Sequence, residues 1–99
     1  LREWRVAEED GCAATLIRIR QGVPAPHHTH GGAEITLVLD GAFRDSTGHY
    51  RAGDIAFADD TVEHRPVADL GRDCICFAVT DAPLRLTGLS GRWLPPMSS

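Results

Sequence analysis

Short apolar runs separated by turn residues dominate the chain. Glycine and proline recur so regularly that no segment free of both exceeds twelve residues, which leaves little room for long amphipathic helices. The runs are rich in Ile, Val, Leu, Phe and Thr, the residue types favoured in β-strands. They cover residues 15–20, 34–40, 42–45, 55–58, 74–80 and 84–87. This pattern predicts an all-β fold, either an antiparallel sandwich or a barrel.

Residues 34–40 alternate between a polar and an aliphatic face, as a strand with two different environments does. One face carries Glu34, Thr36, Val38 and Asp40, and the other carries Ile35, Leu37 and Leu39. We expect the first face to line a polar pocket. We expect the aliphatic face to pack on a second layer, on a second copy in a homodimer, or on a missing domain.

The N-terminal segment fits two structures. Residues 1–9 could form a short helix ended by Gly11, or an edge strand that lays Trp4 and Val6 over the barrel. The pattern leaves both open. We therefore divide the chain into an N-terminal strand or helix at 1–13, a barrel at 14–93, and a flexible tail at 94–99 that contains Pro95 and Pro96.

Composition narrows the class of protein without naming a function. The hydrophobic fraction is 42% and the charged fraction is 24%, as in ordinary globular proteins. The net charge is −4 and the basic residues are scattered arginines, so we expect no binding to nucleic acid. No apolar run approaches the roughly 20 residues that cross a bilayer, and no signal peptide is recognisable, so we expect no membrane association and a cytoplasmic location. The first residue is Leu1 rather than a methionine, from which we expect either a processed product or a piece of a longer protein.

The three cysteines are typical of a reducing compartment. Cys74 and Cys76 are two apart on a predicted strand, so their Cα atoms would lie about 6.5–7 Å apart, at the limit of disulfide geometry. We interpret them as reduced, buried small hydrophobic residues rather than as a redox pair. Cys12 has no neighbouring cysteine in the sequence.

Four residues have the spacing of a metal site. His28 and His30 are two apart, which places both imidazoles on one face of an extended segment, and Glu34 follows a Gly31-Gly32 turn. A fourth ligand, His64, comes more than thirty residues later. Imidazole and carboxylate ligands suit one divalent metal: zinc first, with iron, manganese or nickel as alternatives. The competing interpretation is a surface cluster of histidines around positions 27–30.

The same residues resemble the first cupin motif. A glycine, five residues, HxH, three residues, a glutamate, six residues and a glycine run from Gly22 to Gly41 with every spacing kept. The second motif is partial: Gly53 and His64 are in register, but Asp59, Thr61 and Ala68 replace the usual proline, glycine and asparagine. The resemblance implies a small antiparallel cupin barrel, a double-stranded β-helix or jelly roll. It also implies that the two motifs supply the metal ligands, while the offset of His27 makes it a non-ligand.

A closer resemblance lies within the cupins. Residues 34–45, 51–54, 63–67, 73–80 and 86–89 are similar to the C-terminal cupin domain of ChrR-type anti-sigma factors. In that family an N-terminal zinc domain binds the sigma factor, and the cupin domain is needed for the response to singlet oxygen and related oxidants. The zinc domain is absent from this chain. The resemblance therefore implies a metal-binding sensory domain of a transcription regulator, with oxidation of Cys74 and Cys76 as an auxiliary idea.

Two other functions remain open from the sequence. The same ligands would serve a small metal-dependent enzyme, such as a dioxygenase, because they leave coordination positions for substrate. Candidate substrate-orienting residues are Thr36, Arg18, Arg20, His49 and Tyr50, although each fits an ordinary surface or packing role better. A structural or sugar-binding barrel with a vestigial metal site is the third interpretation.

Overall fold

The structure is a computed structural model that describes residues 1–25, 32–59 and 65–81. Within these residues the chain forms strands and no helix, so the predicted all-β class is confirmed. None of the described residues belongs to a helix long and apolar enough to cross a membrane. The strands are β1 (Arg2–Glu9), β2 (Cys12–Ile19), β3 (Glu34–Asp40), β4 (Ala42–Asp45), β5 (Gly48–Arg51), β6 (Ile55–Ala58), β7 (Val67–Ala68) and β8 (Cys74–Thr80).

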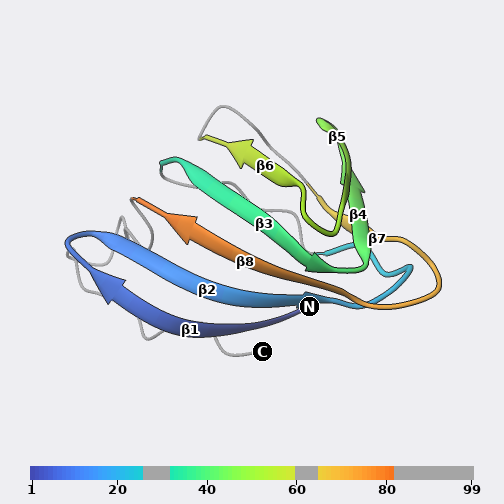
Figure 1. Cartoon of the computed structure of the whole chain (residues 1–99), viewed down its shortest axis with the longest axis horizontal. Helices are drawn as coiled ribbons and strands as arrows, with labels where there is room; N and C mark the ends of the chain where they lie inside the picture. The colour runs from blue at the N-terminus through green and yellow to red at the C-terminus, as the bar shows by residue number, and fades with distance from the viewer. Residues whose placement is uncertain (26–31, 60–64, 82–99) are drawn as a thin grey trace.

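Two antiparallel sheets make up the fold (Figure 1). The larger sheet has the strand order β1-β2-β8-β3-β6, and the smaller has the order β5-β4-β7. Strand β8 lies between β2 and β3, although it comes last in the described sequence. The N-terminal segment is the edge strand β1, paired with β2, rather than a helix.

The hydrophobic core lies between the two sheets at one end of the larger sheet. It contains Ile19, Val38, Phe43, Ala68, Cys74 and Cys76, all buried. Ile19 pairs with Cys74 across β2 and β8, and Val38 pairs with Cys76 across β3 and β8, so these side chains point to the same face. Phe43 of β4 contacts Tyr50 of β5, with ring centroids 5.2 Å apart. The smaller sheet therefore covers the end of the larger sheet at which β2 finishes and β8 begins.

Gly41 makes the corner between the two sheets. It joins β3 directly to β4 and has a φ of 76°, a conformation that side chains with a Cβ rarely adopt. A Cβ placed on Gly41 would lie 2.5 Å from the backbone oxygen of Asp73 and 3.0 Å from the Cα of Cys74. The start of β8 thus approaches this corner too closely for any side chain.

Four of the predicted strands have the bounds expected from the sequence: β3, β4, β6 and β8. Strand β2 begins three residues earlier than predicted, at Cys12, and ends at Ile19. Strands β5 and β7 were not predicted. β5 has the sequence GHYR, in which the half-buried Tyr50 is the one large apolar side chain, and β7 has two residues. The predicted strand at 84–87 lies outside the described residues.

One side-chain direction in β3 differs from the prediction. Glu34 and Val38 are buried and point inward as expected, but Asp40 does not share their face. The register with β8 shifts between Val38 and Asp40, so Asp40 pairs with Ile75 instead of continuing the inward row. Its carboxylate accepts a hydrogen bond of 2.8 Å from Arg72 Nη1 at the surface. The irregularity turns the end of the strand toward solvent.

Candidate metal centre

Glu34, the first residue of β3, is the candidate ligand that the structure describes. Its side chain is 8% exposed, which is unusual for a carboxylate. It stands opposite Thr80 of β8 and Ala58 of β6, on the inward face of the larger sheet. The inward direction predicted from the alternation of residues 34–40 is therefore confirmed for Glu34. A buried carboxylate is stable as an anion only beside groups that compensate for its lost hydration, and a metal ion is one such group.

Small side chains surround Glu34 on the inward face. The neighbouring inward positions on the four adjacent strands are Ala13, Thr15, Thr36, Ala56, Ala58, Ala78 and Thr80. The bulky core residues Ile19, Val38 and Phe43 lie at the opposite end of the sheet. The described part of the sheet thus places short side chains next to the candidate ligand, which suits the several groups that a metal ion gathers around itself.

The three histidines of the candidate site, His28, His30 and His64, lie outside the described residues. Among residues 1–25, 32–59 and 65–81, no three His, Cys, Asp or Glu side chains form a group that could hold a metal. The described residues on either side of these histidines show where the chain enters and leaves their segments.

The segments next to the histidines are held close together on one side. The Ala25 N–H donates a hydrogen bond of 2.9 Å to the carbonyl of Pro66, and Pro24 forms an antiparallel bridge with Val67. Ala25 is three residues before His28, and Pro66 is two residues after His64. The chain thus enters the first histidine segment beside the point at which it leaves the second.

The other ends of the two segments also meet. Glu34, which follows the first segment, pairs with Ala58, which precedes the second. The described ends of the two histidine segments therefore meet at the same two places in the fold. One place is the Ala25–Pro66 hydrogen bond, and the other is the pair of Glu34 with Ala58.

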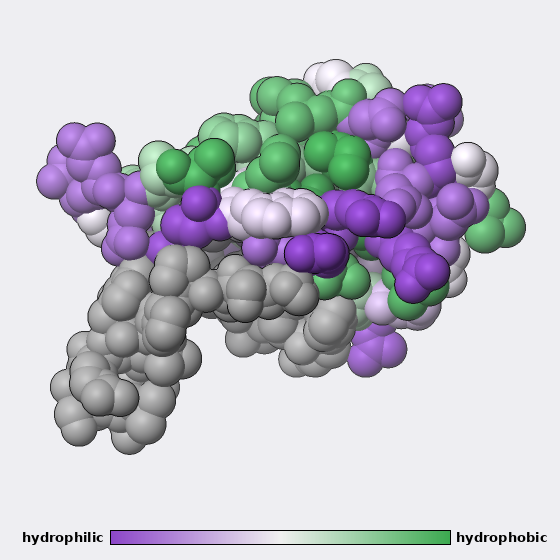
Figure 2. Space-filling model, turned by 90° about the horizontal axis from the view of Figure 1, so that it is seen from below, coloured by the Kyte–Doolittle hydropathy of each residue, from purple (hydrophilic) through white to green (hydrophobic). Residues whose placement is uncertain are grey.

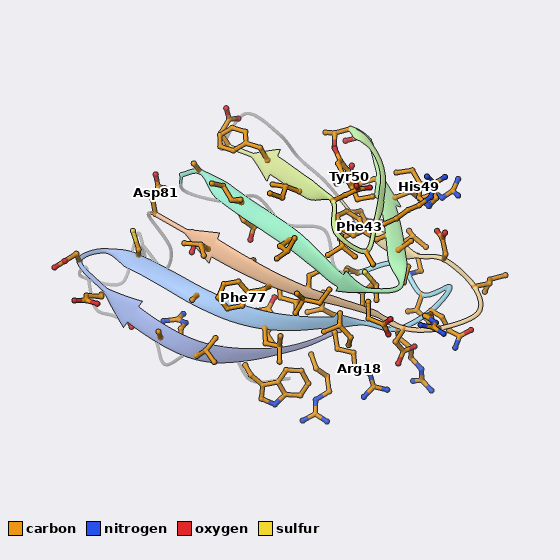
Figure 3. All side chains as sticks on the ribbon, viewed as in Figure 1. Arg18, Phe43, His49, Tyr50, Phe77 and Asp81 are labelled. Atoms are coloured by element: carbon orange, nitrogen blue, oxygen red, sulfur yellow. The ribbon has the colours of Figure 1, made fainter. Side chains whose placement is uncertain are left out.

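Asp81 fixes the backbone immediately before Glu34. Its Oδ1 accepts a hydrogen bond of 2.7 Å from the Ala33 N–H, and its own N–H donates to the Ala33 carbonyl at 3.1 Å. Figure 3 shows Asp81 at the end of β8, beside the start of β3. Asp81 was not singled out from the sequence, because nothing in a single chain indicates that the residue after one strand supports the start of another.

The candidate substrate-orienting residues are mostly engaged elsewhere. Arg18 donates to Asp73 Oδ2 at 2.8 Å, and His49 Nε2 hydrogen-bonds to Asp69 Oδ2 at 2.9 Å, both at partly exposed positions. The Tyr50 hydroxyl lies 2.7 Å from Thr47 Oγ1. Figure 3 shows His49 and Tyr50 on the smaller sheet, away from Asp81 and the start of β3. Of the five candidates, Thr36 shares the inward face with Glu34.

Cys74 and Cys76 are buried and unbridged, as predicted. Their Sγ atoms lie 3.5 Å apart on the inward face of β8. The contact with Cys74 and burial raise the pKa of the Cys76 thiol far above its usual range. Because the thiolate is the reactive form, Cys76 is held in its unreactive state and contributes to the core as a small apolar side chain.

Alkylation of the native protein with iodoacetamide is expected to modify Cys12 alone. Cys12 is exposed, whereas Cys74 and Cys76 have almost no accessible surface. Intact mass spectrometry would then show one adduct on the native protein and three after denaturation in guanidinium chloride. In a Cys12→Ser variant the native protein should remain unmodified, and rapid native labelling of that variant would contradict the described burial.

The comparisons with known proteins agree on one family. The family model described as the ChrR cupin-like domain matches residues 2–84. The anti-sigma-E factor ChrR of Cereibacter sphaeroides is 52% identical over 83 residues, which cover 84% of this chain and 39% of that protein. A crystal structure of Rhodobacter sphaeroides SigE in complex with the anti-sigma ChrR matches with a TM-score of 0.75 and 48% identity, over 80% of this chain and 44% of that one.

More distant matches establish the fold. An RmlC-like cupin from Shewanella frigidimarina has a TM-score of 0.68 at 19% identity, over 81% of this chain and 74% of that one. The predicted cupin fold, the double-stranded β-helix, is therefore confirmed. The chain spans less than half the length of the ChrR proteins that it matches.

Proposed function

The chain belongs to the ChrR cupin-like family, and from that premise we propose that it is the metal-binding sensory domain of an anti-sigma factor. The observation that carries this proposal is the 52% identity to an anti-sigma factor over 84% of this chain. In this proposal the partner is a sigma factor, bound through a further domain equivalent to the part of ChrR that this chain does not match.

The metal centre of the proposal consists of His28, His30, Glu34 and His64. Three neutral imidazoles and one carboxylate are good ligands for zinc, which we propose as the metal, with iron, manganese or nickel as alternatives. Two features support this set. Glu34 is buried on the inward face among small side chains. The chain ends flanking both histidine segments are hydrogen-bonded or paired to each other.

The signal in this proposal is an oxidant of the singlet-oxygen type. The metal would link the segments at 26–31 and 60–64 to β3 through its ligands. A reaction of the oxidant with one ligand histidine would then change how firmly the metal holds both segments to β3. Asp81 and the Ala25–Pro66 contact hold the surrounding backbone in place, which confines the change to the ligand segments. A partner domain that contacts these segments would then be released.

A chimera tests the proposed sensory role. In ChrR of Cereibacter sphaeroides, the 83-residue matching region would be replaced by this chain, and SigE-dependent transcription would be measured with a reporter before and after exposure to singlet oxygen. We expect repression in the dark and an induction comparable to that of the unmodified protein. The chimera with His30→Ala should repress but respond at least about tenfold less.

The control is the chimera with His49→Ala, which removes a histidine that hydrogen-bonds Asp69 on the smaller sheet and is not a proposed ligand. It should respond as the parent chimera does. A His30→Ala chimera that still responds fully would show that the metal centre does not sense the oxidant. A parent chimera that represses and binds metal but never responds would overturn the sensory role of this domain.

A further inference from the structure

The outward side of the larger sheet carries a continuous apolar surface. Two rows of side chains cross the strands, and together we call them the outer apolar face. The first row contains Trp4, Leu16, Phe77, Leu37 and Ile55, and the second contains Val79, Ile35 and Phe57. Figure 2 shows hydrophobic residues gathered along one side of the molecule, with hydrophilic residues at both ends.

Several of these side chains are unusually exposed. Ile55 is 64% exposed, Phe57 58% and Ile35 50%. Exposed apolar residues scattered singly are normal, but contiguous ones on adjacent strands mark a surface that another body covers. Covering such a face removes apolar surface from water, which favours association. The outer apolar face of the larger sheet therefore has the character of a protein–protein interface.

On the β1–β2 side, the two ends of this face carry opposite charges. At one end lie Arg2, Arg18 and Arg20, where β1 begins and β2 finishes. Asp73 forms an ion pair of 2.8 Å with Arg18, and the guanidinium of Arg2 lies 5.1 Å from the centre of the Trp4 ring, so that Arg2 borders the outer apolar face. Figure 3 shows Arg18 and Asp81 at opposite ends of the sheet, with Phe77 between them.

The opposite end is acidic. The β1–β2 hairpin places Glu9 and Asp10 there, β8 is followed by Asp81, and β6 is followed by Asp59. Glu9 pairs with Cys12, which places it on the same outward side as Trp4 and Leu16. Along β1 and β2 the outer apolar face is therefore flanked by arginines at its basic end and by Glu9 and Asp10 at its acidic end, while Asp40 and Asp54 lie at the basic end of β3 and β6.

We infer that the occupant of this face is a second copy of the chain, packed face to face with its strands running in the opposite direction. A two-fold axis that lies in the interface across the strands sets the basic end of each copy against the acidic end of the other. In particular, Arg2 of one copy faces Glu9 of the other. A two-fold axis along the strands would instead place like charges together, which is unfavourable.

The free edge of β1 is not suited to pairing with a strand of a second copy. Its register with β2 shifts between Arg5 and Ala7, which is a bulge, and the strand carries five charged residues in REWRVAEE. Bulges and charges on an edge strand prevent another strand from pairing with it. Association through the sheet face, rather than through β1, is therefore the arrangement that the structure favours.

The dimer is tested by light scattering coupled to size-exclusion chromatography. The wild-type chain should have the mass of a dimer, and a variant with Ile35→Glu and Phe57→Glu should be a monomer at the same concentration. The control variant has Val23→Glu and Leu70→Glu, which change two exposed apolar residues outside the larger sheet, and it should remain a dimer. Circular dichroism would establish that each variant is folded.

Charge reversal tests the antiparallel arrangement. Arg2→Glu and Glu9→Arg should each raise the dimer dissociation constant roughly threefold to tenfold, and the double reversal should restore it, because each copy then again presents opposite charges. A monomeric wild-type chain would overturn the dimer and leave the face to a different partner, such as a further domain. A dimer unchanged by Ile35→Glu and Phe57→Glu, or a double reversal that is weaker than either single one, would overturn the proposed interface.

Discussion

A variant with His30→Ala and His64→Ala is expected to lose its metal and to unfold roughly 15–30 °C below the wild-type protein. Metal that binds the folded chain alone adds about 4 kcal/mol when its free concentration is about a thousand times the dissociation constant. For a domain of this size each kcal/mol moves the melting temperature by about 4–8 °C. Removal of half of the proposed ligands should abolish this contribution. The measurements are elemental analysis of the purified proteins and calorimetric melting.

The matched control replaces the two histidines that the proposal leaves out of the site. A variant with His27→Ala and His49→Ala should retain about one equivalent of metal, and it should lose at most about 1 kcal/mol through the half-exposed contact of His49 with Asp69. Treatment of wild type with a chelator should reproduce the low melting temperature of the ligand variant. Wild-type protein that contains no metal, or that melts unchanged after the chelator, would rule out the metal centre.

Gly41→Ala is expected to destabilise the fold by about 3 kcal/mol or more. A left-handed conformation costs a residue with a Cβ about 1–2 kcal/mol. The added Cβ would also lie 2.5 Å from the Asp73 carbonyl oxygen, so β8 would have to move away from the corner between the sheets. The melting temperature should fall by roughly 12–24 °C.

Gly53→Ala separates the conformational cost of a positive φ from the steric cost of the added Cβ. Gly53 also has a positive φ, 93°, but nothing lies within 4 Å of the position of an added Cβ. Its substitution should therefore cost only the conformational part, about 1–2 kcal/mol. Equal melting temperatures for the two variants would mean that the close approach of β8 to Gly41 contributes nothing.

The sequence predicted those strands that are short apolar runs bounded by turn residues. Strand β3 alternates at its start, whereas β6 (IAFA) and β8 (CICFAVT) are nearly continuous apolar runs, and all three stand out from the polar segments around them. Strand β5 was missed because both its faces are largely polar, and its pairing with β4 comes from the tight turn in which Asp45 accepts hydrogen bonds from Thr47. Strand β7 is too short to have a period.

The direction of Glu34 could be predicted, whereas its surroundings could not. Alternation separates Glu34, Thr36 and Val38 from Ile35, Leu37 and Leu39, and the interpretation of the first face as the lining of a polar pocket turned Glu34 inward. The proximity of Ala25 to Pro66, and of Glu34 to Ala58, depends on pairings between strands distant in the chain, which local pattern does not encode. For the same reason Asp40 was assigned to the wrong face: the register shift beside it arises from its pairing with β8.

The position of β8 in the larger sheet has a consequence for how the protein folds. Strands β2 and β3 are both hydrogen-bonded to β8 rather than to each other. The sheet therefore remains in two separate pieces until residues 74–80 leave the ribosome, because neither piece can close over the core alone. Contacts of such long sequence separation make folding slow compared with that of helical domains.

This folding order also concerns the candidate ligands. Glu34 gains its inward neighbour Thr80 and the hydrogen bonds of Asp81 to Ala33 only when β8 has been inserted. Until then the start of β3 lacks the described contacts that hold its backbone in place. The surroundings of Glu34 are therefore completed in one late step, the insertion of β8, rather than strand by strand along the chain.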